Sequence, residues 1–229
     1  MPLVSPRAEP AVFDEDGPLN PDAVAAGLNQ VWPRSEPLLL SADVGDCLFT
    51  AMGVNQAHLA APGYYASMGF GVPAGLGMQA ASGRRTVMLV GDGAFQMTGW
   101  ELGNCVRYGW DPIVIVLNNA CWEMLRTFQP ESQFNLLNRW DFAGLANALG
   151  GNGVRVTTRA EYLAALRQAL ARRGTFQLIE VSLPRGCVSQ TMTRFAEGLS
   201  RHRRSLLVDA HRVPAAEQAG EGGCLGFNS

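Results

Sequence analysis

Long apolar runs and basic clusters are both missing from the 229-residue sequence. Its longest apolar runs, at residues 86–90 and 113–117, have the length of strands, whereas a membrane-spanning helix needs roughly 20 apolar residues. The first ten residues contain no apolar core of the kind found in secretory signals. Lys and Arg number 18 against 20 Asp and Glu, giving a net charge of −2. We therefore expect neither a membrane nor a nucleic acid as a partner.

Cysteine pairs and histidine clusters are absent as well. No two cysteines are spaced as C-x-x-C, and the histidines show no metal-ligand spacing. The sequence thus predicts neither a zinc site nor a disulfide framework, and free thiols in a cytoplasmic protein are expected. We expect the histidines at the surface or in a tail, so proton-transfer groups are scarce in this chain. The residues concerned are Cys47, Cys105, Cys121, Cys187 and Cys224, with His58, His202 and His211.

What the sequence does contain is an alternation of apolar strands and helical segments. Asn-Pro-Asp at residues 20–22 is typical of a helix start, and the T-x-x-E patterns at Thr98 and Thr158 predict two more. The expected strands are residues 37–41, 86–90, 113–117, 154–156 and 176–181, and further helices are expected up to residue 81, over residues 142–149 and over residues 190–204. This order predicts an α/β fold, a three-layer parallel sheet with helices on both faces.

Composition indicates where the domain begins and ends. Residues 1–18 contain four prolines and mixed polar residues, which is typical of a linker or tail. Residues 19–204 carry the periodic segments and form the predicted domain. Residues 205–229 are rich in Gly and Ala without an apolar period, so a disordered tail is expected there.

Two of the predicted strands end in polar motifs. Gly91-Asp92-Gly93-Ala94 follows the strand at residues 86–90, and Asn118-Asn119 follows the strand at residues 113–117. Ligands of open parallel sheets bind at the carboxyl ends of strands. If the two strands are neighbours, Asp92 and Asn119 face each other across one small space.

The oxygen atoms expected around this space favour Mg2+. Asp92 offers a carboxylate, Asn119 an amide oxygen, and Cys121 a main-chain carbonyl just beyond. Three oxygens are too few for a Ca2+ cage made of protein alone, but Mg2+ often takes its remaining ligands from phosphates and water. The glycines allow close approach of a diphosphate, and a helix beginning near Thr98 would favour an anion.

Each motif has a simpler interpretation when taken alone. A single Gly-Asp-Gly is most often only a turn, and Asn-Asn after a strand is usually the start of a loop. Their combination, 27 positions from Asp92 to Asn119 with one helix and one strand between them, is much more specific. Neither a G-K-[ST] phosphate loop nor a G-x-G-x-x-G dinucleotide loop after a strand occurs.

Three segments together resemble the thiamine diphosphate-dependent 2-oxo acid decarboxylase family. They are GDGAFQMT at residues 91–98, NNACWEML at residues 118–125 and WDFA at residues 140–143. Within that family the chain is most similar to the indolepyruvate/phenylpyruvate decarboxylase type, over residues 38–195. The resemblance implies the thiamine diphosphate-binding fold, thiamine diphosphate and Mg2+ as cofactors, and a carboxy-lyase that yields an aldehyde and CO2.

The resemblance also implies roles for individual residues. Asp92 and Asn119 would bind Mg2+ through their side chains, and Cys121 through its carbonyl oxygen. Gly93 and Ala94 would donate backbone N–H groups to the diphosphate. The remaining positions expected around the cofactor are Asp46, Gly91, Trp122, Glu123, Met124 and Leu125, together with Ala66, whose carbonyl would accept from the aminopyrimidine, and Met68, which would wedge the cofactor into a bent shape.

Some residues depart from the family pattern or have a simpler interpretation. Leu125 stands where the simplest pyruvate decarboxylases carry a catalytic glutamate, which favours the aromatic 2-oxo acid branch and leaves no catalytic residue assigned in this chain. Glu123 is alternatively a structural or solvated acid. Met68, without its flanking match, would be interpreted as core filler.

The largest departure is length. Family members have three domains, and this chain matches only the diphosphate-binding one. The resemblance implies a 2-oxo acid substrate, a pyrimidine-binding domain from the same or another chain, and a homo-oligomer in the intact enzyme. Three interpretations stay open: a fragment of a decarboxylase, a small subunit of a split enzyme, or a non-catalytic cofactor-binding module.

Overall fold

A six-stranded, entirely parallel sheet forms the centre of the computed structural model, which describes residues 14–210, with side chains up to residue 202. The strand order is β2-β1-β3-β4-β6-β5. The strands are β1 (Leu38–Ala42), β2 (Ala57–Ala60), β3 (Thr86–Gly91), β4 (Ile113–Asn118), β5 (Asn152–Val156) and β6 (Gln177–Ser182). The chain divides into two units, Met1–Thr193 and Arg194–Ser229, and the sheet belongs entirely to the first.

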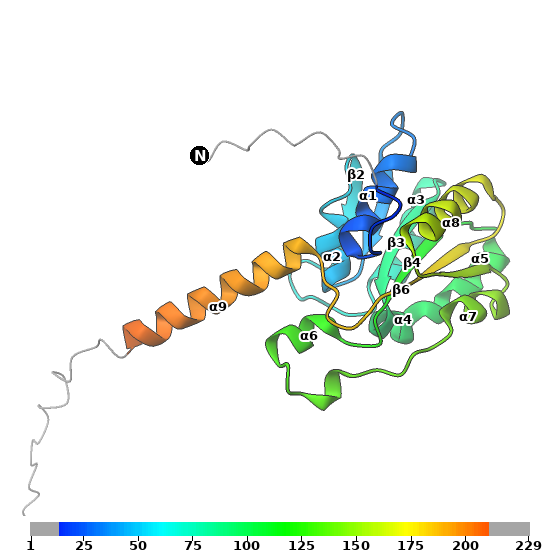
Figure 1. Ribbon diagram of the computed structural model, residues 1–229. Helices are drawn as coiled ribbons and strands as arrows, with labels where there is room; N and C mark the ends of the chain where they lie inside the picture. Colours follow the sequence, from blue (N-terminus) through cyan, green and yellow to red (C-terminus); the bar gives the residue numbers. More distant parts are fainter. Residues whose placement is uncertain (1–13, 211–229) are drawn as a thin grey trace, which may run out of the picture. The chain divides into compact units, whose positions relative to one another are not determined.

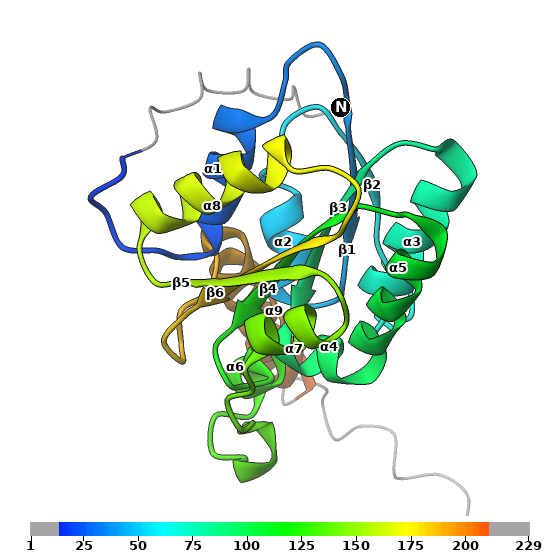
Figure 2. The ribbon, with the colours of Figure 1, turned by 90° about the vertical axis from the view of Figure 1, so that its right-hand side faces the viewer.

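Helices cover both faces of this sheet (Figures 1 and 2). Their bounds are α1 (Pro21–Val31), α2 (Asp46–Ala51), α3 (Gly71–Ser82), α4 (Asp92–Thr98), α5 (Gly103–Tyr108), α6 (Glu123–Phe128), α7 (Phe142–Ala148), α8 (Arg159–Ala171) and α9 (Gln190–Ala210), with 3-10 turns η1 (Gly99–Leu102) and η2 (Gln133–Asn135). α1, α2 and α8 pack on one face, and α3, α4, α5 and α7 on the other. The predicted three-layer α/β fold is confirmed.

Alternation along the central strands builds the two cores. In β3, Val87 and Leu89 belong to the core under α1 and α8, whereas Met88 and Val90 belong to the core under α3 and α7. Successive side chains of a strand point to opposite faces, and a parallel strand covered on both faces must be apolar throughout. β4 meets this demand, since all its residues are buried.

Two predicted helix starts are confirmed in atomic detail. The Asn20 side chain accepts a hydrogen bond from Ala23 N at 2.8 Å, with Pro21 as the first helical residue. Thr158 and Glu161 form a capping box, in which each side chain bonds the backbone of the other residue. Both devices satisfy N–H groups that have no partner within the helix.

The capping box predicted at Thr98 is wrong, although a helical segment does begin there: the 3-10 turn η1 follows Thr98 directly and leads into α5. β3 runs directly into α4, so Asp92 and Gly93 form the first turn of a helix and Thr98 is its last residue. The Thr98 hydroxyl makes no cap and instead donates to the carbonyl of Gly69 at 2.9 Å. A Thr-x-x-Glu pattern therefore misled because a long-range partner claimed the threonine.

Elements and boundaries beyond the prediction also emerge. The edge strand β2 is half-exposed and shows no apolar alternation, which explains why the sequence did not indicate it. α9 continues through residues 205–210, which the sequence analysis assigns to the tail. The rest of that tail and residues 1–13 of the predicted linker lie outside the described residues, as do Cys224 and His211.

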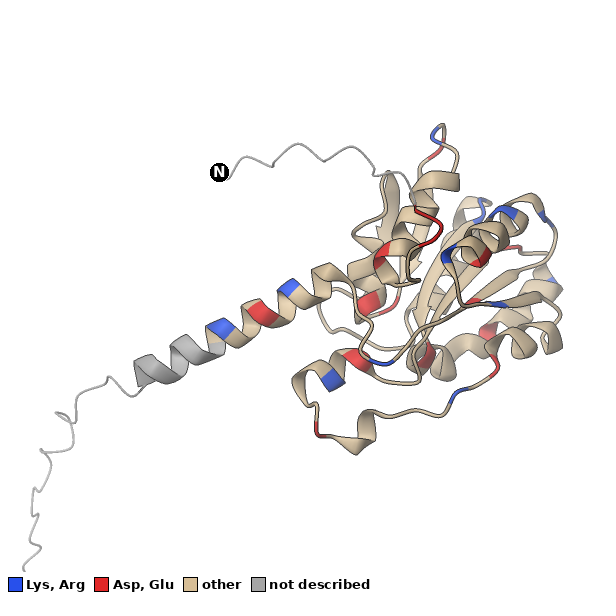
Figure 3. Cartoon of the chain, viewed as in Figure 1, with Lys and Arg blue, Asp and Glu red and all other residues tan. Residues whose placement is uncertain are grey.

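The expected free thiols and surface histidines are found within the described part. Cys47, Cys105 and Cys121 are buried free thiols and Cys187 is a half-buried one, and His58 and His202 are exposed. Within residues 14–210, none of the helices combines the length and apolarity needed to cross a bilayer. Figure 3 shows that basic and acidic residues are both distributed over the elements of the first unit.

The buried Tyr162 of α8 offers a test of the helical layer. Its hydroxyl donates to the carbonyl of Val24 in α1 at 3.0 Å. We expect Tyr162→Phe to lower the free energy of unfolding by about 1 kcal/mol, the typical net value of such a bond. Tyr162→Ala should cost about 3–5 kcal/mol because it leaves a cavity. Urea denaturation measures both, and an unchanged midpoint for Tyr162→Phe would show that the bond adds no stability.

Candidate functional site

Pairing of β3 with β4 brings the two polar motifs together. The strands are parallel neighbours, with Gly91 opposite Leu117. The residues that follow, Asp92 and Asn118-Asn119, therefore leave the sheet at the same edge. This is the neighbour relation on which the sequence-based site depends.

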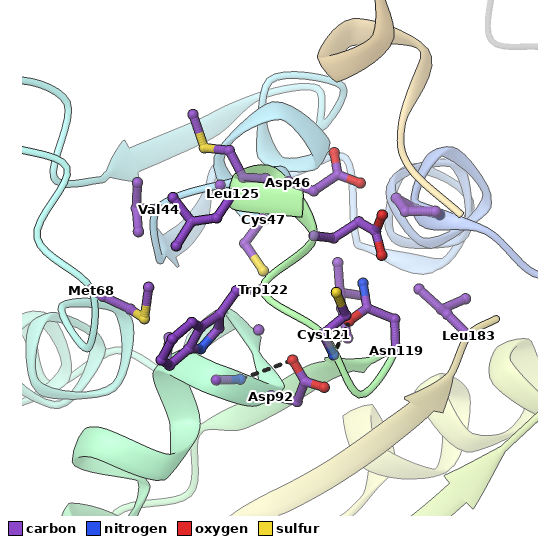
Figure 4. Close-up of a pocket in the computed structure, with 18 of the residues that line it drawn as sticks. Val44, Asp46, Cys47, Met68, Asp92, Asn119, Cys121, Trp122, Leu125 and Leu183 are labelled. Carbon is purple, nitrogen blue, oxygen red and sulfur yellow. Dashed lines mark hydrogen bonds between the residues drawn. The ribbon is translucent and has the colours of Figure 1, made fainter. Parts of the chain in front are cut away.

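A pocket of about 230 Å³ lies at this edge (Figure 4). Its wall comes from the carboxyl ends of the strands and from the segments that follow them. Every residue that the sequence analysis assigned to the cofactor lines it: Asp46, Ala66, Met68, Gly91, Asp92, Gly93, Ala94, Asn119, Cys121, Trp122, Glu123, Met124 and Leu125, together with Pro21, Val44, Gly45, Cys47, Leu117, Leu183 and Cys187.

Asp92 is the buried acid at the base of this pocket, only 3% exposed. Its Oδ1 accepts from Gly93 N at 2.8 Å, whereas its buried Oδ2 accepts no hydrogen bond from the described residues. Burial raises the pKa of Asp92 to about 6, and the backbone N–H groups of Gly93, Ala120 and Cys121 only partly counter this. A buried carboxylate oxygen without a hydrogen-bond donor is costly, and a cation bound beside it would offset that cost.

The two asparagines of the second motif point to different partners. Asn119 lines the pocket, and its Oδ1 accepts from Cys121 N at 3.1 Å. Ala120, which lies between Asn119 and Cys121, has a left-handed φ of 53°, a value that only Gly adopts freely. Asn118 turns away and donates to Glu180 at 2.7 Å. The spacing predicted where the pair lies but could not show this division.

Gly93 is glycine for a steric reason that the structure makes explicit. A Cβ at this position would lie 2.0 Å from Nε1 of Trp122, whose indole covers the glycine. Gly93 and Ala94 belong to the first turn of α4, where N–H groups have no acceptor within the helix. The Gly93 N–H is held by Asp92 Oδ1, so the helix start and the buried acid lie side by side at this edge of the pocket.

Sequence reasoning missed Asp43, a fully buried acid that shapes the opposite wall. Its carboxylate accepts from the N–H groups of Gly69 at 3.1 Å and Gly71 at 2.7 Å. It thereby holds the end of the loop that carries Ala66, which has a φ of 53°, and Met68. Burial raises the pKa of Asp43 above its ordinary value. An acid directly after β1 was the available signal.

Asp46 and Glu123 line the pocket, but their oxygens are engaged by the segment after β6 and, for one oxygen of Glu123, by Arg126 of α6. Both oxygens of Asp46 accept from Ser189, at 2.8 Å from its N–H and 2.5 Å from its hydroxyl. Glu123 pairs with Arg126 at 2.6 Å and accepts from Gly186 N at 3.0 Å. Burial raises the pKa of Asp46. These acids therefore serve as anchors of the wall.

The wall beyond the acids is apolar. Val44, Met68, Met124 and Leu125 all line the pocket, and Leu125 keeps 45% of its surface exposed. Leu125 has no group that could hold or transfer a proton. This side of the pocket therefore offers apolar surface to whatever binds there.

Among the described residues no cluster of three or more His, Cys, Asp or Glu side chains could hold a metal ion. A cation at Asp92 would depend on one carboxylate, the Asn119 amide oxygen and a backbone carbonyl. That donor set is all oxygen and incomplete, which fits Mg2+ completing its shell with phosphate oxygens.

Comparison with known proteins agrees with this geometry. The family model "Thiamine pyrophosphate enzyme, C-terminal TPP binding domain" matches residues 43–181. The chain is 60% identical over 199 residues to the indole-3-pyruvate decarboxylase of Azospirillum brasilense, covering 86% of this chain and 36% of that protein. It is 38% and 37% identical over 126 residues to alpha-keto-acid decarboxylases of Mycobacterium tuberculosis and Mycobacterium avium, covering 53% of this chain and 22% of each relative.

The chain thus spans about a third or less of the length of these curated relatives. The match to the family model covers well over half of this chain and includes both polar motifs. The resemblance to decarboxylases that use thiamine diphosphate is confirmed, and the chain belongs to the thiamine pyrophosphate enzymes, whose C-terminal TPP-binding domain it carries.

Proposed function

We propose that this chain binds thiamine diphosphate through Mg2+ and serves the non-oxidative decarboxylation of a 2-oxo acid of the indolepyruvate or phenylpyruvate type. The observation that carries the proposal is the buried Asp92 at the first turn of α4, whose Oδ2 makes no hydrogen bond to the described residues. The A. brasilense relative is called an indole-3-pyruvate decarboxylase, which supports the aromatic substrate.

In the proposed site, three protein groups would bind Mg2+. Asp92 supplies the charge, Asn119 its amide oxygen and Cys121 its main-chain carbonyl. The N–H groups of Gly93 and Ala94 would bind the diphosphate, which would complete the coordination of Mg2+. Because the pocket has only this one carboxylate with a free oxygen, the anionic cofactor meets little repulsion.

The other end of the site positions the reacting part. Bound thiamine diphosphate supplies the carbon nucleophile and the electron sink that decarboxylation needs. The Ala66 carbonyl would accept a hydrogen bond from the aminopyrimidine, and Met68 would support the bent shape from below. Both belong to the loop that Asp43 anchors through Gly69 and Gly71.

The apolar wall sets the substrate class. Leu125 occupies the position where an acid would contact a small polar substrate, and Val44, Met68 and Met124 complete the lining. An aromatic side chain would bury apolar surface there, at roughly 25 cal/mol per Å². Excluding water also strengthens the electrostatic interactions that act on the departing carboxylate.

We propose that the groups that transfer protons come from a pyrimidine-binding domain, in the same or another chain of a cytoplasmic homo-oligomer. The committed hydrogen bonds of Asp46 and Glu123 favour this, because neither acid is free to act on a substrate. A small subunit of a split enzyme would have the same half-site. A non-catalytic module would bind the cofactor but stay inert with that domain added.

Calorimetric titration with thiamine diphosphate, with and without Mg2+, tests the metal site. We expect binding that requires Mg2+ and falls below detection in Asp92→Ala, because the only charged ligand is gone. Glu36→Ala removes an exposed acid far from the pocket and should bind as the unaltered chain does. Retained affinity in Asp92→Ala would remove this carboxylate from the site.

Gly93→Ala tests the close approach of the backbone. The new Cβ would collide with the Trp122 indole, so the ring must move into the pocket, and we expect the dissociation constant for the Mg2+ complex of thiamine diphosphate to rise at least about tenfold, equivalent to about 1.4 kcal/mol. The matched control is Gly77→Ala, in an exposed helical position with open space around it.

Gly77→Ala should stabilise α3 by up to about 1 kcal/mol and leave cofactor affinity unchanged. Equal affinities for the Gly93 and Gly77 variants would show that the indole yields without disturbing the cofactor, and the steric argument at Gly93 would then fail.

A further inference from the structure

Residues 119–141 form a long excursion from the sheet that carries much of the pocket wall. The excursion starts after Asn118 at the end of β4, includes α6 and η2, and returns at α7 (Figure 1). Asn119, Cys121 and Leu125 all lie on it. Any freedom at its two ends would be transmitted to the proposed metal ligands at once.

One buried acid, Glu180 of β6, holds both ends of this excursion. It is 1% exposed. Its Oε1 accepts from Asn118 Nδ2 at 2.7 Å, at the start, and its Oε2 accepts from Ala143 N at 3.0 Å, just past the return. Arg155 of β5 donates to Oε1 at 2.9 Å and neutralises the charge. Glu180 thus links β4, β5, β6 and the first turn of α7.

Bonds inside the excursion transmit this restraint to the pocket. Leu137 N donates to the carbonyl of Ala120 at 3.0 Å, and Trp122 N donates to that of Asn135 at 2.9 Å. The outgoing and returning halves of residues 119–141 are therefore hydrogen-bonded to each other, while Glu180 holds their two ends together. These two ends are called the neck of the excursion below. Glu180 itself does not line the pocket, so it can act only through the residues it holds.

We infer that Glu180 is a positioning residue for cofactor binding, which fixes Asn119 and the Cys121 carbonyl by clasping the neck of residues 119–141. The predicted effect on cofactor binding rests on the proposed function. The restraint of residues 119–141 by Glu180 does not depend on it. Only a carboxylate suits the position, because Asn118, Ala143 and Arg155 all donate. A glutamine would direct an N–H2 group at one of these donors.

Two measurements test the clasp in Glu180→Gln. Trypsin cleaves only after arginine in this lysine-free chain, and Arg126 and Arg139 lie within the excursion. We expect cleavage there to accelerate at least fivefold without any cofactor. We also expect the Mg2+ concentration for half-maximal thiamine diphosphate binding to rise about tenfold, as for residues that support metal ligands from behind.

Three further variants separate positioning from general stability. Asn118→Ala frees one end of the excursion while keeping the Glu180–Arg155 pair, so it should reproduce both effects if Glu180→Gln fails to fold. Tyr162→Phe destabilises the far helical layer and should change neither effect. Asp141→Asn keeps the oxygen that caps α7 and removes only the negative charge of the exposed ion pair with Arg155, and it should behave as the unaltered chain does.

The outcomes are distinct. Cleavage and Mg2+ dependence that match Tyr162→Phe in both clasp variants would overturn the inference. Faster cleavage with unchanged Mg2+ dependence would overturn the positioning role, since the clasp would then not reach the ligands. If the unaltered chain binds no thiamine diphosphate, the proposed function fails, whereas cleavage still decides whether Glu180 closes the neck.

Discussion

The parallel pairing of β3 with β4 is the constraint on which the site depends. It places Gly91 opposite Leu117, so the chain leaves both strands at one edge, and Asp92 and Asn119 line the same pocket. Parallel pairing demands apolar strands covered on both faces, and the two cores provide that cover. The packing of the sheet therefore determines where the polar residues at this edge lie.

The sequence was informative where a local pattern and a global rule agreed. Strand ends of a parallel sheet share an edge, so Asp92 and Asn119 could be placed together on the condition that their strands are neighbours, which the pairing of β3 with β4 satisfies. The partners of those residues could not be placed. Asp46 is held by Ser189, 143 positions away, and Asn118 by Glu180, 62 positions away. Thr98 failed for the same reason, because its hydroxyl was claimed by the distant Gly69.

The distribution of charge in the pocket follows a single logic. Three acids line it, yet the oxygens of Asp46 and Glu123 accept from backbone N–H groups and neighbouring side chains of the segment after β6 and of α6. Hydrogen bonds to the charged form lower its cost and use its acceptor capacity. Asp92 alone retains a buried oxygen without a described partner. In the proposed function this one carboxylate would bind the cation, through which an anionic cofactor would then be held.

The same arrangement leaves the described wall without a proton-transfer group. Leu125 is apolar, Asp46 and Glu123 are committed, and Asp92 is directed to the proposed metal. A decarboxylation that ends in protonation of carbon therefore needs an acid from outside this wall. In the proposed arrangement this wall is one half of the site, and the hydrogen bonds of Glu180 and Asp43 would hold it in place. A second domain would depend on that, since reacting groups on two domains align only if each side is fixed in advance.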